Sequence, residues 1–180
     1  MKILPLGAMA AVMVTVAMPA AASPAFDGFR SVCGDSHMDF AAIKSAVDAG
    51  HWVPTEVQPN SMPGVTVTES LARTVNAGDA KLTLFAWHGT KGAVQVSACT
   101  VRVTQTKFAD LSHDAQAWTG FAPQSSDTGK AIWQFTEDAG ARKAVQKADY
   151  NTAAAAGGLN FFTVSSAGAE TILDLLKIKS

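Results

Sequence analysis

The apolar residues of the chain change their spacing several times, and each change predicts a change of secondary structure. Helical spacing after residue 23 predicts a short helix that ends at Gly34, followed by a second helix over residues 37–49. Ser36 is expected to cap this second helix, and Gly50 stands where its C-terminal cap belongs. The apolar positions that carry the spacing are Phe26, Phe29, Val32, Cys33, Phe40, Ile43 and Val47.

From Gly64 the period changes to two, which is typical of strands that bury one face. Turn residues interrupt the alternation at 76–79 and again at 89–92. The extended runs between these turns cover residues 65–75, 81–88 and 93–104. Three strands joined by short turns predict an antiparallel meander.

The alternation also assigns side chains to the two faces of this meander. Phe85 and Trp87 are the aromatic pair expected to face outward, although core packing is the better interpretation for the aromatic residues as a set. Cys99 alternates in phase with Val101 and Val103, so it is expected to point into the core.

The second half of the chain shows both periods. Helical spacing predicts a helix over residues 107–119, ended by Gly120. Good helix formers predict another helix over residues 141–156. Extended runs are expected over residues 131–136, 159–165 and 170–178. The last of these has apolar positions that also suit a helix, so the sequence leaves strand and helix open there.

These elements together predict an α+β domain. Its mainly antiparallel sheet should have five or six strands and be packed by two or three helices, with the N-terminal helices and helix 107–119 covering one face. No internal repeat and no linker divides the chain after its N-terminal segment. We therefore expect one domain over residues 23–180.

Residues 1–22 have the pattern of a secretory signal peptide. Lys2 supplies a positive charge, Ile3–Met18 is an uncharged apolar stretch, and Ala20-Ala21-Ala22 places small residues before a cut at Ser23. An uncleaved anchor is the weaker interpretation, because this stretch is shorter than the roughly 20 residues that span a bilayer. The chain is thus expected to be exported to a bacterial periplasm or secreted, without a lipid anchor.

Charge and composition narrow the function classes. The chain has 180 residues, with 14 Lys and Arg against 15 Asp and Glu. Removal of Lys2 leaves 13 basic and 15 acidic residues, so there is no basic excess to neutralise the phosphates of a nucleic acid. No later run is long and apolar enough to cross a membrane, so no membrane association is expected after cleavage.

Cys33 and Cys99 are the two cysteines of the chain. In an oxidising compartment an even number of cysteines favours a disulfide, and closing this loop would stabilise the fold by about 4 kcal/mol. Free buried thiols are one alternative. A metal site formed by Cys33 with His37 is another, but it lacks the further ligands that zinc requires.

Histidine is the usual acid, base or ligand, and the chain has four: His37, His51, His88 and His113. His113 is expected on the solvated side of helix 107–119, and His51 fits the C-terminus of helix 37–49. His88 ends a predicted strand, where functional residues do occur. His37 and Asp39 follow Asp35, a grouping that suits a cation but that helix capping also explains.

No motif identifies a reaction. A nucleophile elbow, a zinc-protease signature, a phosphate-binding loop and a paired-cysteine redox motif are all missing from the sequence. We therefore expect a non-catalytic module, without cofactor or metal, that binds a protein or a small ligand over the exposed sheet face or near residues 88–92. One alternative is a small hydrolase or metal-assisted enzyme that uses His37, Asp39 and His88. The other is an inhibitor of a periplasmic enzyme that projects loop 89–92.

Overall fold

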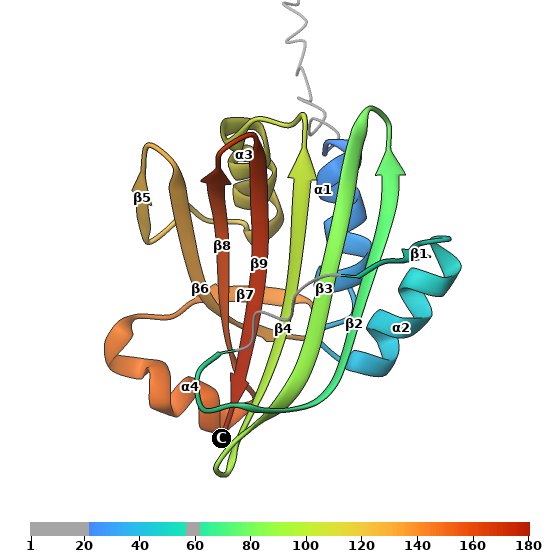
Figure 1. The fold of residues 1–180 in the computed structure, drawn as a ribbon. Helices are drawn as coiled ribbons and strands as arrows, with labels where there is room; N and C mark the ends of the chain where they lie inside the picture. The colour runs from blue at the N-terminus through green and yellow to red at the C-terminus, as the bar shows by residue number, and fades with distance from the viewer. Residues whose placement is uncertain (1–21, 57–61) are drawn as a thin grey trace, which may run out of the picture.

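The computed structural model describes residues 22–56 and 62–180. Among these residues nine strands form one antiparallel sheet: β1 (Val53–Pro54), β2 (Thr66–Ala77), β3 (Ala80–Lys91), β4 (Val94–Thr104), β5 (Ser125–Asp127), β6 (Lys130–Asp138), β7 (Ala141–Ala144), β8 (Leu159–Ala167) and β9 (Glu170–Lys179). The strand order is β1-β2-β3-β4-β9-β8-β6-β5, and β7 pairs with β6 (Figure 1). The C-terminal strand β9 therefore joins the two halves of the sheet.

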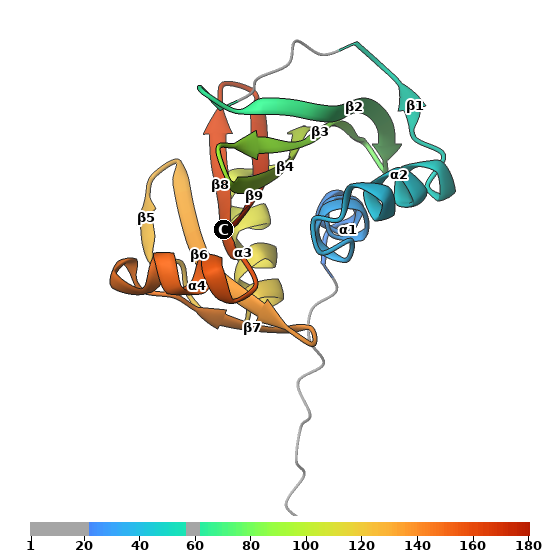
Figure 2. The ribbon, with the colours of Figure 1, turned by 90° about the horizontal axis from the view of Figure 1, so that it is seen from below.

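The described helical segments are α1 (Pro24–Phe29), the π-helical turn η1 (Arg30–Gly34), α2 (Phe40–Ala49), α3 (Phe108–Thr119), the 3₁₀ turn η2 (Lys147–Asp149) and α4 (Tyr150–Ala156). The sheet is curved, and α1, α2 and α3 lie on its concave side (Figure 2). This arrangement confirms an α+β fold with the N-terminal helices and α3 on one face.

The predicted strand number of five or six was too low. The six predicted strands correspond to β2, β3, β4, β6, β8 and β9, and the additional ones are β1, β5 and β7. Each additional strand has between two and four residues. Runs of this length are too short to show a period of two, so alternation could not reveal them.

Residues 170–178, for which the sequence allowed either a strand or a helix, belong to the strand β9. It pairs with β4 on one side and β8 on the other over nearly its whole length. Leu173 and Leu175 are buried toward the helices, while Asp174 and Leu176 alternate with them on the other face. Pairing on both sides outweighs the local helical pattern.

The predicted start of helix 37–49 was wrong by three residues. His37 and Met38 have φ values of 52° and 63°, in the left-handed region that a helix cannot include. Asp39 therefore takes the N-cap position, and its Oδ1 accepts a 2.8 Å hydrogen bond from the backbone N–H of Ala42. The Ser36 hydroxyl instead donates to the carbonyl oxygen of Cys33.

The predicted helix over residues 141–156 was also wrong in its first half. Ala139 and Gly140 form a tight turn with positive φ, and β7 returns from it along β6. Only Tyr150–Ala156 is α-helical. Helix-forming composition is a weak signal where a hairpin turn and strand pairing favour another structure.

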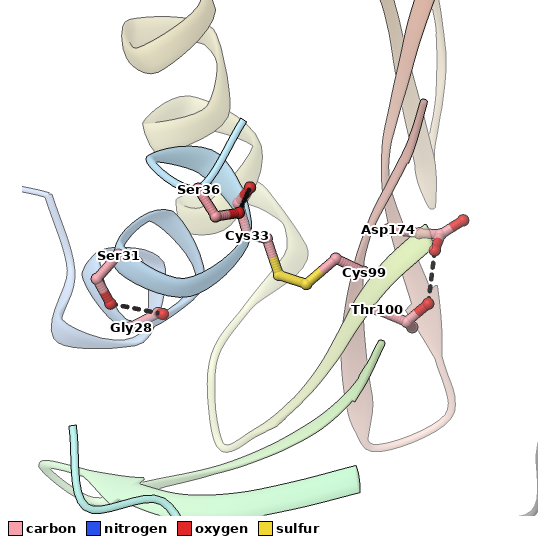
Figure 3. The surroundings of a disulfide bond; sticks show 7 residues. All are labelled: Gly28, Ser31, Cys33, Ser36, Cys99, Thr100 and Asp174. Atoms are coloured by element: carbon pink, nitrogen blue, oxygen red, sulfur yellow. Dashed lines mark hydrogen bonds between the residues drawn. A yellow bond between two sulfur atoms is a disulfide. The ribbon is translucent and has the colours of Figure 1, made fainter. Parts of the chain in front are cut away.

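The core lies between the sheet and the three helices, and a disulfide crosses it. Cys33 of η1 and Cys99 of β4 are bonded, with Cα atoms 5.7 Å apart and no exposed surface (Figure 3). The predicted pairing is confirmed, which excludes both the free thiols and the metal site with His37. The same core contains a cluster of aromatic rings that contact one another: Phe26, Phe29, Trp118, Trp133 and Phe162.

One prediction concerns a part of the chain that the structure does not describe. The signal peptide falls on residues 1–22, of which 1–21 lie outside the described residues. Residues 57–61, between β1 and β2 in the sequence, also lie outside the described residues. None of the described helices has the length and apolar character needed to cross a membrane.

Candidate functional site

We call the sheet face opposite α1, α2 and α3 the outer face. Phe85 and Trp87 of β3 belong to it, as their alternation predicted. The strand register places Phe85 beside Thr100 of β4, and Thr100 beside Asp174 of β9. Thr163 of β8 continues the same row. One row of outward side chains thus combines an aromatic ring, two hydroxyl groups and a carboxyl group.

Two segments cover parts of the outer face. α4, at the lower left in Figure 1, packs Ala153 and Ala154 against Leu159 near the ends of β8 and β9. Met62 packs against Trp87 from the other side, leaving the Trp87 side chain 3% exposed. A groove of about 540 Å³ lies on the face between these covered parts. This outer groove is lined mainly by Phe85, Trp87, Thr100, Ile172, Asp174 and Leu176.

Asp174 is the carboxylate of the outer groove. The Thr100 hydroxyl donates a 2.6 Å hydrogen bond to its Oδ1, on the side of β4 away from the disulfide (Figure 3). Burial raises the pKa of Asp174 above its usual value of 3.8, and the hydrogen bond from Thr100 opposes that rise in part. The groove therefore holds a carboxyl group whose charged form is poorly solvated.

No cationic side chain pairs with Asp174 within the part of the chain that the structure describes. Arg102 also lines the groove, but its Nη1 lies 3.5 Å from Oε2 of Glu170. Lys130 is exposed at the groove edge, two strands away from β9 in the sheet order. Residues 57–61 read Val-Gln-Pro-Asn-Ser, so they have no cationic side chain to offer.

His37, one of the sequence candidates, lies away from this groove in a network of charged groups. Its Nδ1 is 3.0 Å from Oε2 of Glu137, and Oε1 of Glu137 is 2.8 Å from Nη2 of Arg142. The Arg142 guanidinium stacks 3.9 Å above the Trp118 ring and donates to the Trp118 carbonyl oxygen. Burial lowers the pKa of Arg142, and the charge of Glu137 raises it in part. The partly buried carboxylate of Glu137 therefore orients the exposed His37 ring.

The other two candidates, Asp39 and His88, are held elsewhere. Asp39 caps α2, while the His88 ring stacks on Phe40 with ring centres 5.0 Å apart. The Nε2 atom of His88 is buried and has no hydrogen-bond partner among the described residues. Across that part of the chain, no hydrogen bond or ion pair joins His37, Asp39 and His88 to one another. A shared catalytic role for these three residues remains a prediction.

Residues 89–92, the loop of the inhibitor hypothesis, lie at the end of the β3–β4 hairpin. Gly89, Thr90 and Lys91 are strand residues paired with β4, and the chain turns at Gly92, where φ is 60°. Gly89 also packs closely against β2, because a Cβ at this position would overlap the Thr66 carbonyl oxygen. Residues 89–91 are thus held by strand pairing, and an inhibitory role for this hairpin end remains a prediction.

A larger hollow of about 1060 Å³ lies beside β2. Its lining mixes opposite charges, including Lys44, Glu56, Glu69 and Arg73. Glu56 of this lining is the last described residue before the stretch 57–61, and Met62 of the outer groove is the first described residue after it. Within residues 22–56 and 62–180, no group of three or more His, Cys, Asp or Glu side chains is placed to hold a metal ion.

No protein-family model matches the chain, and no curated protein or solved structure shows a significant similarity to it. The class that the structure defines is a disulfide-bonded α+β domain with a ligand-sized groove on the outer face of its sheet. Two residues of that groove, Thr100 and Asp174, were not found from the sequence. Their partnership depends on the register between β4 and β9, which are 74 residues apart at this pair.

Proposed function

We propose that the protein is an exported, non-catalytic module that binds a small molecule in the outer groove. The observation that carries this proposal is the groove itself, where a carboxylate without an ion pair among the described residues lies beside both apolar and polar side chains. Its volume of about 540 Å³ falls within the range of about 300–1,000 Å³ that is typical of small-molecule sites. The apolar lining provides contact area, and the few polar groups would fix the orientation of a ligand.

The chemistry of the lining supports binding rather than catalysis. Asp174 is the one carboxylate among the described lining residues, and the other polar groups are hydroxyls, Arg102 and Lys130. Nucleophilic catalysis requires a nucleophile with an adjacent base, and the described lining contains no histidine or cysteine for either role. Export is supported by the N-terminal pattern and by the disulfide, since disulfides persist in oxidising compartments.

A fragment screen by protein-observed NMR tests the binding site. We expect fragments to shift the amide resonances of Phe85, Thr100, Asp174 and Leu176 in the mature protein. The variant Thr163→Trp would fill the groove and abolish these shifts, whereas Ser126→Trp on the exposed edge strand β5 would leave them unchanged. Shifts that cluster outside the groove, or that survive Thr163→Trp, would contradict the proposal.

One contact favours a second function, a small hydrolase. The hydrogen bond between His37 and Glu137 fixes Nδ1 of the ring, which leaves Nε2 available as a general base. Open hollows of about 430 Å³ and 470 Å³ flank this pair. A hydrolytic activity toward model esters that is lost in His37→Asn, but not in His113→Asn, would support this function over the first.

A further inference from the structure

We propose that the ligand of the outer groove is a small organic cation: an ammonium or guanidinium group on an apolar body, with its charge against Asp174. The inference rests on the proposed function, because it names the ligand class of the same groove. Four observations carry it: the surroundings of the carboxylate, the position of the nearby cations, the aromatic lining and the volume.

The first observation is that the Asp174 carboxylate has little to replace its lost water. Within the described residues the carboxylate accepts one side-chain hydrogen bond, which the Thr100 hydroxyl donates. Ile172 and Leu176 flank Asp174 along β9. Removing a carboxylate from water without a positive partner costs free energy that a cationic ligand would restore. A neutral ligand would bury the charge further and offer no compensation.

The second observation is that no basic side chain of the described residues forms an ion pair with Asp174. Arg102 forms an ion pair with Glu170. Lys130 is exposed on β6, two strands away from the strand β9 that carries Asp174. The described structure gives Asp174 no charge partner, and residues 57–61 contain no Lys, Arg or His. Lys2 is the single basic side chain of residues 1–21, and it belongs to the segment expected to be removed.

The third and fourth observations concern the body of the ligand. Phe85 is the row neighbour of Thr100, two strands from Asp174 in the sheet order, and it lines the same groove with an aromatic ring. Aromatic faces attract cations. Leu176 and Ile172 extend this apolar surface. A volume of about 540 Å³ fits a compact amphipathic molecule. A peptide strand would add to an edge of the sheet, and the edges are formed by the short strands β1 and β5. We therefore favour a small ligand in the groove over an added peptide strand.

This pairing predicts a dependence of affinity on pH. The other charged side chains that line the groove are the basic residues Arg102 and Lys130. Burial raises the pKa of Asp174 in the free protein. A cation binds the ionised carboxylate, so affinity should fall as the pH falls through this pKa, and ligand binding should lower the pKa.

The test is an NMR titration of the mature protein with arylalkyl amines of different stem lengths, led by phenethylamine. The neutral isostere 2-phenylethanol and the anion phenylacetate are titrated in parallel. We expect the best amine to bind at Phe85, Thr100 and Leu176 at least about tenfold more tightly than the alcohol, and phenylacetate to bind more weakly still. Asp174→Asn should remove this preference for the amine while leaving the alcohol unaffected, because Asn keeps the shape and can still accept from Thr100.

Glu170→Gln is the matched control, since it removes a carboxylate from the same strand outside the Asp174 contact. It should retain the amine preference, and the amide spectrum of each variant checks that it is folded. Equal binding of amine and alcohol in the groove would overturn the cationic ligand class while the proposed binding site stands. Failure of every amine to bind there would also overturn the ligand class, and the fragment screen would then decide the proposed function separately.

Discussion

The two faces of the same strands have different physical character. Toward the helices, Leu84, Val101 and Leu173 are fully buried in a core that the disulfide crosses. On the outer face, Thr100 and Asp174 are half-buried and face a groove. Adjacent residues of one strand thus belong to a close-packed interior and to an incompletely covered surface. We infer that the inner face provides the stability, and the outer face is where we propose that a ligand binds.

Loss of the disulfide should have the largest effect on this comparison. The double variant Cys33→Ala with Cys99→Ala is expected to lower the free energy of unfolding by about 4 kcal/mol, because the 66-residue separation leaves a long open loop in the unfolded chain. Chemical denaturation measures the loss. A change below about 1 kcal/mol would show that the inner face does not depend on this bond.

Truncation of one aromatic residue on each face compares their packing directly. Phe162 is fully buried and contacts Phe29, Trp118 and Trp133, so Phe162→Ala should cost about 3 kcal/mol. Phe85→Ala on the outer face should cost about 1 kcal/mol, because Phe85 is only half-buried. Equal losses in denaturant melts would remove the distinction between the two faces.

A single methyl group tests how closely β2 packs against Gly89 of β3. A Cβ at Gly89 would overlap the backbone oxygen of Thr66, so Gly89→Ala should lower stability by about 2 kcal/mol. Gly129→Ala is the control, since the nearest atom to its added Cβ is 3.7 Å away. Indistinguishable thermal stability of the two variants would argue against the close β2–β3 contact.

Asp174→Asn should have the smallest effect on the free energy of unfolding, and it should raise stability where the other variants lower it. Its folded-state pKa is raised, so the folded protein binds its proton more strongly than the unfolded chain does. Wild-type stability is therefore lost as the pH rises from 3.8 through the folded-state pKa, and the variant avoids this loss. At neutral pH the variant should be more stable by about 1 kcal/mol.

The control for this prediction is the same pair of proteins at low pH. Below the unfolded-state value of 3.8 the carboxyl is protonated in both states, so the gain of the variant should disappear. A variant that is less stable than wild type at neutral pH would contradict the description of Asp174 as an unpaired, poorly solvated charge.

Sequence patterning found the parts of the fold that depend on local alternation. It identified the long strands, α3, the outward phase of Phe85 and the pairing of Cys33 with Cys99. It missed β7, where helix-forming residues follow a hairpin turn at Gly140. Local composition does not show which strand lies beside a segment, and that neighbour decides its structure.

The candidate site was harder to predict for the same reason. Asp174 lies in a run of apolar residues that suits either a helix or a strand, and only pairing with β4 brings it to Thr100. His37 is a candidate from the sequence, but its hydrogen-bond partner Glu137 is 100 residues away. The first contact depends on the register between β4 and β9, and the second depends on the packing of the turn at His37 against β6. Inspection of either segment alone could therefore not reveal these contacts.

The most direct test of a cation site in the outer groove is the pKa of Asp174, measured from its side-chain carboxyl resonance in the mature protein with and without phenethylamine. We predict a pKa above 3.8 in the free protein, because the carboxylate is poorly solvated, and a lower pKa once the amine is bound. A pKa that is at or below 3.8 in the free protein, or that is unchanged at saturating amine, would contradict the account.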